Sequence, residues 1–231
     1  QVRDVTSAEP AYKTRLTMPI TSGDESNIRW VANSRLGYIS MAKEHYRESI
    51  SYLTSAYKVA ATAERQEEAA ASIGTAYDFL NDREQATSWY RKAGSQPEVQ
   101  RSLNRSPTPQ EQIAEKIAWA YSIGLYSRVV SLADSAIVGK HLPDTQTLTQ
   151  VLYQQGVACY ESGLYDRADK CFTTVLSTQG AEVWLHPYSH YRLGMSLVKQ
   201  DQTAAAKQQF AKVLEFEDYP SEDILRKRVA R

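Results

Sequence analysis

The sequence predicts an all-α protein, built as a right-handed superhelical solenoid of antiparallel helix pairs. The first observation is residues 153–176, YQQGVACYESGLYDRADKCFTTVL, which have the pattern of two short amphipathic helices broken at Ser162-Gly163. The second is that the same order of glycine, aromatic residue and alanine recurs in looser form along much of the chain. One helix pair cannot bury its apolar faces alone, so these repeats are expected to stack on one another.

Residues 153–176 show why small and aromatic residues share this unit. Two antiparallel helices approach closely only where one of them is small, and Gly156 and Ala168 provide such surfaces. Three aromatic residues are expected to fill the space around that contact: Tyr160, Tyr165 and Phe172. Gly163 is predicted to end the first helix, at a position where a positive φ is commonly required.

Five units of this kind follow one another along the chain. At the position of the glycine they carry Gly37, Gly74, Ile117, Gly156 and Gly194. These positions lie 37, 43, 39 and 38 residues apart. The third unit is degenerate, because isoleucine stands where glycine is expected. Two helices in each unit give ten repeat helices, followed by a terminal helix.

In residues 153–176, Gly156 before Tyr160 and Ala168 before Phe172 resemble the tetratricopeptide pattern G-x2-Y…A-x3-F, with small departures. The resemblance covers residues 28–216 and implies five tetratricopeptide-like units. Spacings above the usual ~34 residues indicate an extended-repeat variant of that family. The chain also lacks the signature tryptophan at the start of each unit, and most of the closing prolines are missing.

The chain is predicted to divide into two groups of repeats with a spacer between them. The first residues lack helical periodicity, and the spacer carries three prolines, so it could act as a hinge. The predicted order is an irregular arm or linker at 1–26, two repeats at 27–94, a proline-containing spacer at 95–110, three repeats at 111–217 and a C-terminal capping helix at 218–231.

The composition argues against nucleic-acid and membrane functions. The 231 residues carry 27 basic and 27 acidic side chains, so no global field is expected to attract nucleic acid or an acidic membrane. No apolar run approaches the roughly 18–20 residues that cross a bilayer, so no membrane insertion is expected. The chain is interpreted as soluble, with the cytoplasm favoured. Because the sequence opens at Gln1, an envelope or periplasmic location stays open if a leader was removed.

No catalytic or cofactor-binding motif stands in the sequence, so neither an enzymatic activity nor a cofactor is expected. Glycine-rich phosphate loops and the G-x-S-x-G nucleophile motif are both missing. His186 and His190 are four residues apart, but Pro187 between them and the lack of a third ligand argue against a metal site. Cys159 and Cys171 are interpreted as two buried thiols, with a disulfide as the alternative and a zinc site not expected.

The resemblance implies a binding surface. In the tetratricopeptide family, the inner face of each first helix lines a concave groove that binds peptides or partner helices. Tyrosine suits such an interface because it combines a large apolar body with a polar tip. The alternative is that several of these tyrosines pack between adjacent repeats. Alignment with the family places nine residues on the inner face: Tyr38, Met41, Asp78, Tyr121, Tyr153, Tyr160, Tyr188, Tyr191 and Met195.

The same alignment argues against one binding mode of the family. Members that hold a C-terminal carboxylate carry Lys, Asn and Arg at groove positions. Here the corresponding residues are uncharged: Ser34, Tyr38, Ser72, Thr75 and Ala114. A carboxylate clamp is therefore not expected.

Together these observations predict a non-enzymatic scaffold or adaptor that binds a peptide segment or helix of another protein in a tyrosine-rich groove. Two alternatives stay open. The chain could be the repeat or sensor domain of a larger signalling or envelope protein, or it could self-assemble into a homo-oligomer through its repeat faces. The sequence does not specify the partner.

Overall fold

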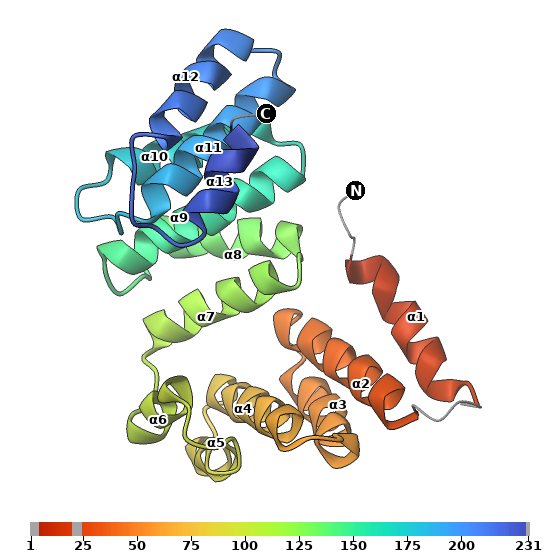
Figure 1. Cartoon of the computed structure of the whole chain (residues 1–231). Helices are drawn as coiled ribbons and strands as arrows, with labels where there is room; N and C mark the ends of the chain where they lie inside the picture. Colours follow the sequence, from red (N-terminus) through yellow and green to blue (C-terminus); the bar gives the residue numbers. More distant parts are fainter. Residues whose placement is uncertain (1–4, 20–24, 230–231) are drawn as a thin grey trace. The chain divides into compact units, whose positions relative to one another are not determined.

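The computed structural model describes residues 5–19 and 25–229, which form thirteen α-helices and contain no β-strand (Figure 1). The prediction of an all-α protein is therefore confirmed. The described residues divide into two compact units. The first unit holds the described residues up to Gln112 together with Ser122–Leu125. The second unit holds Ile113–Tyr121 and the described residues from Tyr126 onward. Helix α7 (Pro109–Ser122) crosses this division.

The first unit is built from six helices besides the start of α7: α1 (Val5–Thr17), α2 (Glu25–Ala42), α3 (Tyr46–Val59), α4 (Ala63–Phe79), α5 (Arg83–Tyr90) and α6 (Pro97–Asn104). Helices α2 and α3 form one hairpin, and α4 and α5 form the next. Packing of α3 on α4 joins the two hairpins. Helix α1 packs on α2, and α6 packs on α5.

The second unit contains most of α7 and six further helices: α8 (Tyr126–Val138), α9 (Thr145–Glu161), α10 (Tyr165–Ser177), α11 (Leu185–Lys199), α12 (Thr203–Val213) and α13 (Glu222–Val229). Two hairpins, α9–α10 and α11–α12, stack through contacts between α10 and α11. Helix α8 packs on α9, and the terminal helix α13 packs on α11 and α12.

In four hairpins, a glycine of the first helix lies against a large side chain sixteen residues later, on the second helix. The pairs are Gly37–Leu53, Gly74–Tyr90, Gly156–Phe172 and Gly194–Phe210. A Cβ atom added at Gly156 would lie 2.7 Å from a ring carbon of Phe172. That distance is far inside van der Waals contact, so a side chain there would force the ring or the helix to move.

The turns between the two helices of the five predicted units also repeat. Each has one residue in the left-handed conformation, seven positions after the glycine or its equivalent: Glu44 (φ 61°), Asn81 (φ 58°), Gly124 (φ 75°), Gly163 (φ 76°) and Asp201 (φ 59°). In four of them the next N–H donates to the carbonyl five residues earlier, as from Leu164 to Cys159. Helix α9 ends at Glu161, so the prediction that Gly163 ends the first helix is confirmed. The degenerate third unit shares this turn conformation.

Helix α1 corrects the prediction of an irregular arm at residues 1–26. Its residues have little apolar periodicity and include Pro10, so the sequence shows no helical stripe there. The helix is held by packing on α2 and by Glu9, which pairs with Lys13 at 2.8 Å and with Lys43, the residue after α2, at 2.5 Å. Residues 1–4 and 20–24 of the predicted arm lie outside the described residues.

Helix α6 lies inside the predicted spacer, which is therefore not irregular throughout. Pro97 occupies the first turn of this helix, where its missing N–H costs no hydrogen bond, and Val99 is buried. The role of residues 95–110 as a hinge stays a prediction. The terminal helix is present as Glu222–Val229, within the segment 218–231 that was predicted to hold it; residues 230–231 lie outside the described part.

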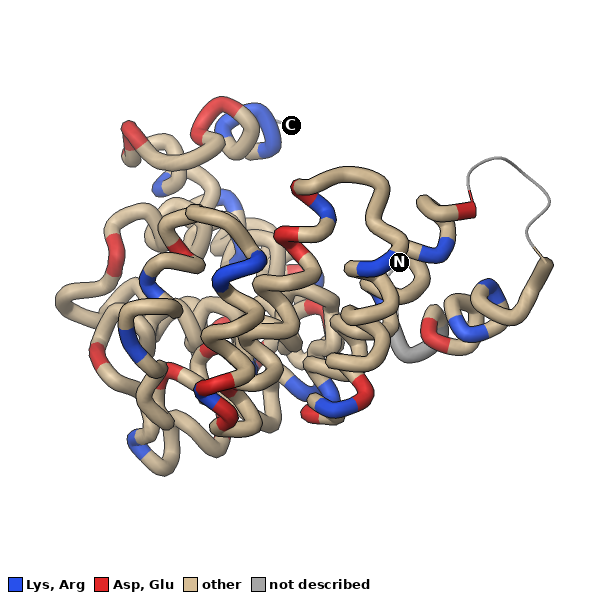
Figure 2. Tube along the Cα trace, turned by 90° about the horizontal axis from the view of Figure 1, so that it is seen from below, with Lys and Arg blue, Asp and Glu red and all other residues tan. Residues whose placement is uncertain are grey.

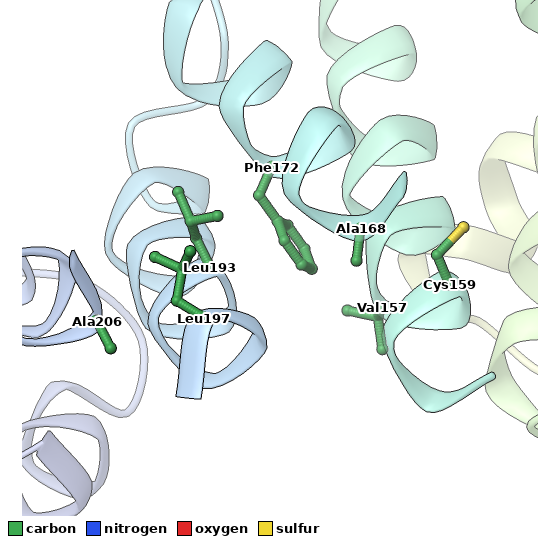
Figure 3. Packing of buried hydrophobic residues seen from close by; sticks show 7 residues of the cluster. All are labelled: Val157, Cys159, Ala168, Phe172, Leu193, Leu197 and Ala206. Carbon is green, nitrogen blue, oxygen red and sulfur yellow. The ribbon is translucent and has the colours of Figure 1, made fainter. Parts of the chain in front are cut away.

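The core of the second unit gathers around Phe172, which is fully buried. Figure 3 shows its ring between Ala168 and Val157 on one side and Leu193 and Leu197 on the other. The two leucines belong to α11. One aromatic ring therefore packs the hairpin α9–α10 against the helix that follows it.

Charged residues of both signs are interspersed along the trace of each unit (Figure 2). This distribution agrees with the equal numbers of acidic and basic residues in the sequence. Within residues 5–19 and 25–229, no helix has the length and apolar character needed to cross a membrane.

Candidate functional site

The nine candidate groove residues all lie on first helices of hairpins, but the structure divides them between the units. Tyr38 and Met41 lie on α2 and Asp78 lies on α4, all in the first unit. The other six lie in the second unit, on α7, α9 and α11: Tyr121, Tyr153, Tyr160, Tyr188, Tyr191 and Met195.

The three candidates of the first unit are engaged within that unit. Tyr38 is half-buried, and its hydroxyl donates a hydrogen bond to Glu68 Oε1 at 2.6 Å. The pKa of Tyr38 is raised mainly by burial and, to a smaller extent, by this hydrogen bond. Met41 is 1% exposed and Asp78 is 5% exposed. The Asp78 carboxylate accepts hydrogen bonds from Tyr90 and Arg83. Met41 and Asp78 therefore leave the set of proposed contact residues, because neither side chain reaches the surface.

Three tyrosines of the second unit come together over its apolar core. Tyr121, Tyr153 and Tyr160 are half-buried and pack against the cluster around Phe172. The ring of Tyr153 lies 5.9 Å from that of Phe172, and the ring of Tyr160 lies 5.7 Å from that of Tyr165 in an edge contact. The ring of each tyrosine is thus fixed by packing, while part of the side chain stays accessible to solvent.

Sequence reasoning missed a residue beside these tyrosines, Arg192 of α11. Its side chain is 29% exposed, and Nη1 lies 3.7 Å from Glu161 Oε1. Its charge also interacts with the Tyr153 side chain, and each group shifts the pKa of the other. Arg192 lies four residues after Tyr188 on the same helix, but an isolated charge there gives no periodic signal, so the sequence pattern did not single it out.

The electrostatics of this group keep the arginine charged and the neighbouring tyrosines neutral. Burial raises the pKa of Tyr153 to about 12 and also raises the pKa of Tyr121 and of Tyr160. Burial acts to lower the pKa of Arg192, but Tyr153, Tyr121 and Glu161 raise it overall. At neutral pH the site is thus a half-buried cation among tyrosine hydroxyls. We call Tyr121, Tyr153, Tyr160, Glu161 and Arg192 the Arg192 surface.

Tyr188, Tyr191 and Met195 do not form part of the Arg192 surface as defined. Tyr188 and Tyr191 pack on the C-terminal cluster of Val213, Tyr219 and Leu225. The Tyr188 hydroxyl also donates to the carbonyl oxygen of Pro220. Met195 is half-buried on α11. For Tyr188 and Tyr191, these contacts favour the alternative that some of the tyrosines pack within the repeats.

The cysteine and histidine candidates are enclosed in the second unit. Cys159 and Cys171 are free, buried thiols, and Cys171 Sγ donates a hydrogen bond to Gln155 Oε1 at 3.4 Å. His190 Nδ1 lies 2.7 Å from Gln209 Oε1, and burial lowers the pKa of His190. In the part of the chain that the structure describes, no three His, Cys, Asp or Glu side chains are grouped so that they could hold a metal ion.

Two segments of the chain, residues 67–93 and 187–218, match the tetratricopeptide repeat family. They fall on the hairpins α4–α5 and α11–α12, which are the second and fifth predicted units. These two segments are thus tetratricopeptide repeats, and the predicted fold class, an α-α superhelix of antiparallel helix pairs, is confirmed.

Solved structures with similar helix arrangements include MamA proteins and a pilF protein. MamA AMB-1 is 19% identical, with 86% of this chain and 97% of that chain covered and a TM-score of 0.42. MamA from Desulfovibrio magneticus RS-1 is 15% identical, with 81% and 94% covered and a TM-score of 0.40. The pilF protein of Pseudomonas aeruginosa is 14% identical, with 89% and 84% covered and a TM-score of 0.35. At TM-scores below 0.5 these likenesses carry no argument about this chain.

A search of curated proteins finds no match to the sequence. The class itself is informative, because tetratricopeptide repeat domains are typically protein–protein interaction scaffolds and are generally non-catalytic. Their fold implies protein partners.

Proposed function

We propose that this chain is a non-enzymatic scaffold that binds a peptide segment or helix of another protein through the Arg192 surface of its second unit. The observation that carries the proposal is the half-buried Arg192, 3.7 Å from Glu161 and interacting electrostatically with Tyr153 and Tyr121, together with the three half-buried tyrosines that pack on the cluster around Phe172. Arginine and tyrosine are the residue types most enriched among the energetically dominant positions of protein interfaces.

The geometry supports this use of the arginine. A close charge-assisted pair has a distance of about 2.7–2.9 Å, so the 3.7 Å contact with Glu161 leaves guanidinium N–H groups able to donate to another molecule. The tyrosines are already held by packing on the core, so little conformational freedom remains to be lost when a partner binds. A preformed surface of this kind favours binding without rearrangement of the helices.

The proposal is tested with two variants and a matched control. The captured partner is first identified from source lysate and purified, since capture alone does not locate the binding surface. Its Kd is then measured against the wild type, Tyr160→Ala, Arg192→Gln and the control Tyr52→Ala, a half-buried tyrosine on α3 of the first unit. We expect each of the first two to weaken binding about 30-fold, as an anchor worth about 2 kcal/mol would, and Tyr52→Ala to leave it unchanged.

Unchanged affinity in both Arg192-surface variants, with melting temperatures close to the wild type, would place the partner elsewhere. Light scattering on the purified chain tests the remaining alternative of self-association. If the chain forms a dimer that Tyr160→Ala dissociates, the occupant of the surface is a second copy of the chain rather than another protein.

A further inference from the structure

The second unit also contains a pocket that is lined by none of the residues of the Arg192 surface. It is a pocket of about 490 Å³ between the segment that precedes α11 and the segment that follows α12. Its walls include three aromatic residues and three acidic residues: Trp184, Phe216, Tyr219, Glu182, Glu217 and Asp218. Neither Lys nor Arg is among the described residues that line it.

Within the described part of the chain, no basic side chain neutralises the carboxylates of this pocket. No described lysine or arginine forms an ion pair with Glu182, Glu217 or Asp218. Glu182 Oε2 accepts the indole N–H of Trp184 and a hydrogen bond from Gln150, which fixes this carboxylate at the pocket wall. The field inside the pocket is therefore negative.

Arg226 is a nearby base, but it is already held. Its Nε lies 2.6 Å from Glu222 Oε1, and its Nη2 donates to the carbonyl oxygen of Phe216 at 2.7 Å. The neighbouring Tyr219 side chain is 7% exposed, and its hydroxyl forms no hydrogen bond of normal geometry within the described chain. Arg226 is therefore not free to pair with the pocket carboxylates, and the Tyr219 hydroxyl is buried rather than exposed to the pocket.

At two other tryptophans of this chain, a basic side chain of the same chain lies over the ring. Arg65 lies over the ring of Trp30 at 4.4 Å from its centroid, and the Lys92 ammonium lies over Trp89 at 3.9 Å. Trp184 is 39% exposed, and no lysine or arginine of the described chain lies over its ring in this way. Its ring is instead held at the edge by Tyr188, with the centroids 6.1 Å apart.

We propose that this pocket binds the cationic side chain of a lysine or arginine from a partner protein. Aromatic faces attract a cation through their negative quadrupole, and the attraction increases where the cation is partly desolvated. The three carboxylates add a second attraction of the same sign and exclude anionic side chains. The site is independent of the Arg192 surface, which has the opposite charge at its centre.

The test follows the indole N–H signals of the four tryptophans by NMR, because Trp184 reports on the pocket and Trp30, Trp89 and Trp119 serve as internal references. The full chain is titrated with Nα-acetyl-lysine amide, Nα-acetyl-arginine amide and the neutral Nα-acetyl-norleucine amide. We expect a saturable shift of the Trp184 signal with one or both cationic amides and none with the norleucine amide. The stronger of the two cationic ligands identifies the side chain.

A double variant separates the pocket from the general charge of the region. Glu217→Gln with Asp218→Asn should weaken binding of the cationic amide about fivefold, as the loss of about 1 kcal/mol of charge attraction would. The matched control, Glu215→Gln with Asp223→Asn, removes the same charge from exposed residues that do not line the pocket and should leave binding unchanged. The proposal is overturned if the norleucine amide shifts Trp184 equally, if no ligand does so, or if the control variant loses as much affinity.

Discussion

The second and fourth repeats make the same close contact with different chemistry. In both, a glycine of the first helix lies against an aromatic ring of the second, Gly74 against Tyr90 and Gly156 against Phe172. The Tyr90 hydroxyl donates to Asp78 Oδ2 at 2.9 Å, whereas the surroundings of Phe172 are apolar. One oxygen atom on the ring therefore distinguishes a polar hairpin from an apolar one.

The hydroxyl of Tyr90 has consequences along the chain. Asp78 is 5% exposed and accepts a hydrogen bond from Arg83 Nη1 at 3.2 Å. Arg83 Nη2 in turn donates to the carbonyl oxygens of Ser102 and Leu103 in α6. The second repeat is thus linked to α6 by a polar network, whereas the fourth is linked to α11 by Leu193 and Leu197 around Phe172. The comparison teaches that Asp78 serves the fold.

The largest expected effect is the loss of the apolar link. Phe172→Ala should lower the free energy of unfolding by about 3–5 kcal/mol, because it removes a fully buried ring and leaves a cavity. Urea denaturation measures this, with the exposed Lys199→Ala as a control expected within about 0.5 kcal/mol of the wild type. A loss below about 1 kcal/mol would show that Phe172 does not hold the fourth repeat.

The next effect concerns the polar link. Arg83→Met should cost about 2–3 kcal/mol, because it leaves the Asp78 carboxylate buried without its cation and leaves two α6 carbonyls without their donor. The cost is below that of a fully buried pair, since the Arg83 side chain is 30% exposed. Adding Asp78→Asn to this variant removes the unpaired charge and should recover part of the stability; a further loss would argue against a paired carboxylate.

A smaller effect follows when a hydroxyl is placed in the apolar repeat. Phe172→Tyr should lower the free energy of unfolding by about 1–3 kcal/mol. The added hydroxyl would be buried among apolar side chains, with no carboxylate like that of Asp78 to accept its hydrogen bond. Thermal melting and urea denaturation give the difference. Wild-type stability in this variant would mean that the fourth repeat can accommodate a polar group after all, and the contrast between the two hairpins would fail.

The smallest expected loss of stability comes from the reverse substitution, which removes the hydroxyl from the ring of the second repeat. Tyr90→Phe removes the bond to Asp78 but leaves Arg83 in place, so the expected cost is about 1 kcal/mol. Measured in the Asp78→Asn background as well, the two changes should be non-additive, because both remove the same hydrogen bond. Additive losses would show that Tyr90 and Asp78 act separately.

Much of the fold could be predicted from the sequence, because close contacts between helices require side chains of particular sizes at fixed positions. The degenerate third unit supports this logic. Sixteen residues after Ile117 stands Ala133, and both are fully buried. In this unit the large residue stands on the first helix and the small one on the second. This order is the reverse of that in the other four units, so the pairing of a large with a small residue is kept.

The candidate site was less predictable, because side-chain direction depends on the partner helix. Asp78 and Met41 were assigned to a groove from their place on a first helix, yet packing encloses both. Arg192 was missed because an isolated charge on an amphipathic helix gives no periodic signal. Helix α1 was missed for the same reason, since its stability comes from packing on α2 and not from its own pattern.

The left-handed turn residues have a consequence for how repeat proteins of this kind accept new sequence. The distance from the glycine position to the turn residue is constant at seven residues, whereas successive repeats are 37, 43, 39 and 38 residues apart. All variation in length therefore falls after the turn, mostly in the connections that lead from one hairpin to the next. An epitope or binding loop inserted after Lys140, in the exposed connection between α8 and α9, extends a segment that already varies, whereas the same insertion at Gly163 interrupts the conserved spacing.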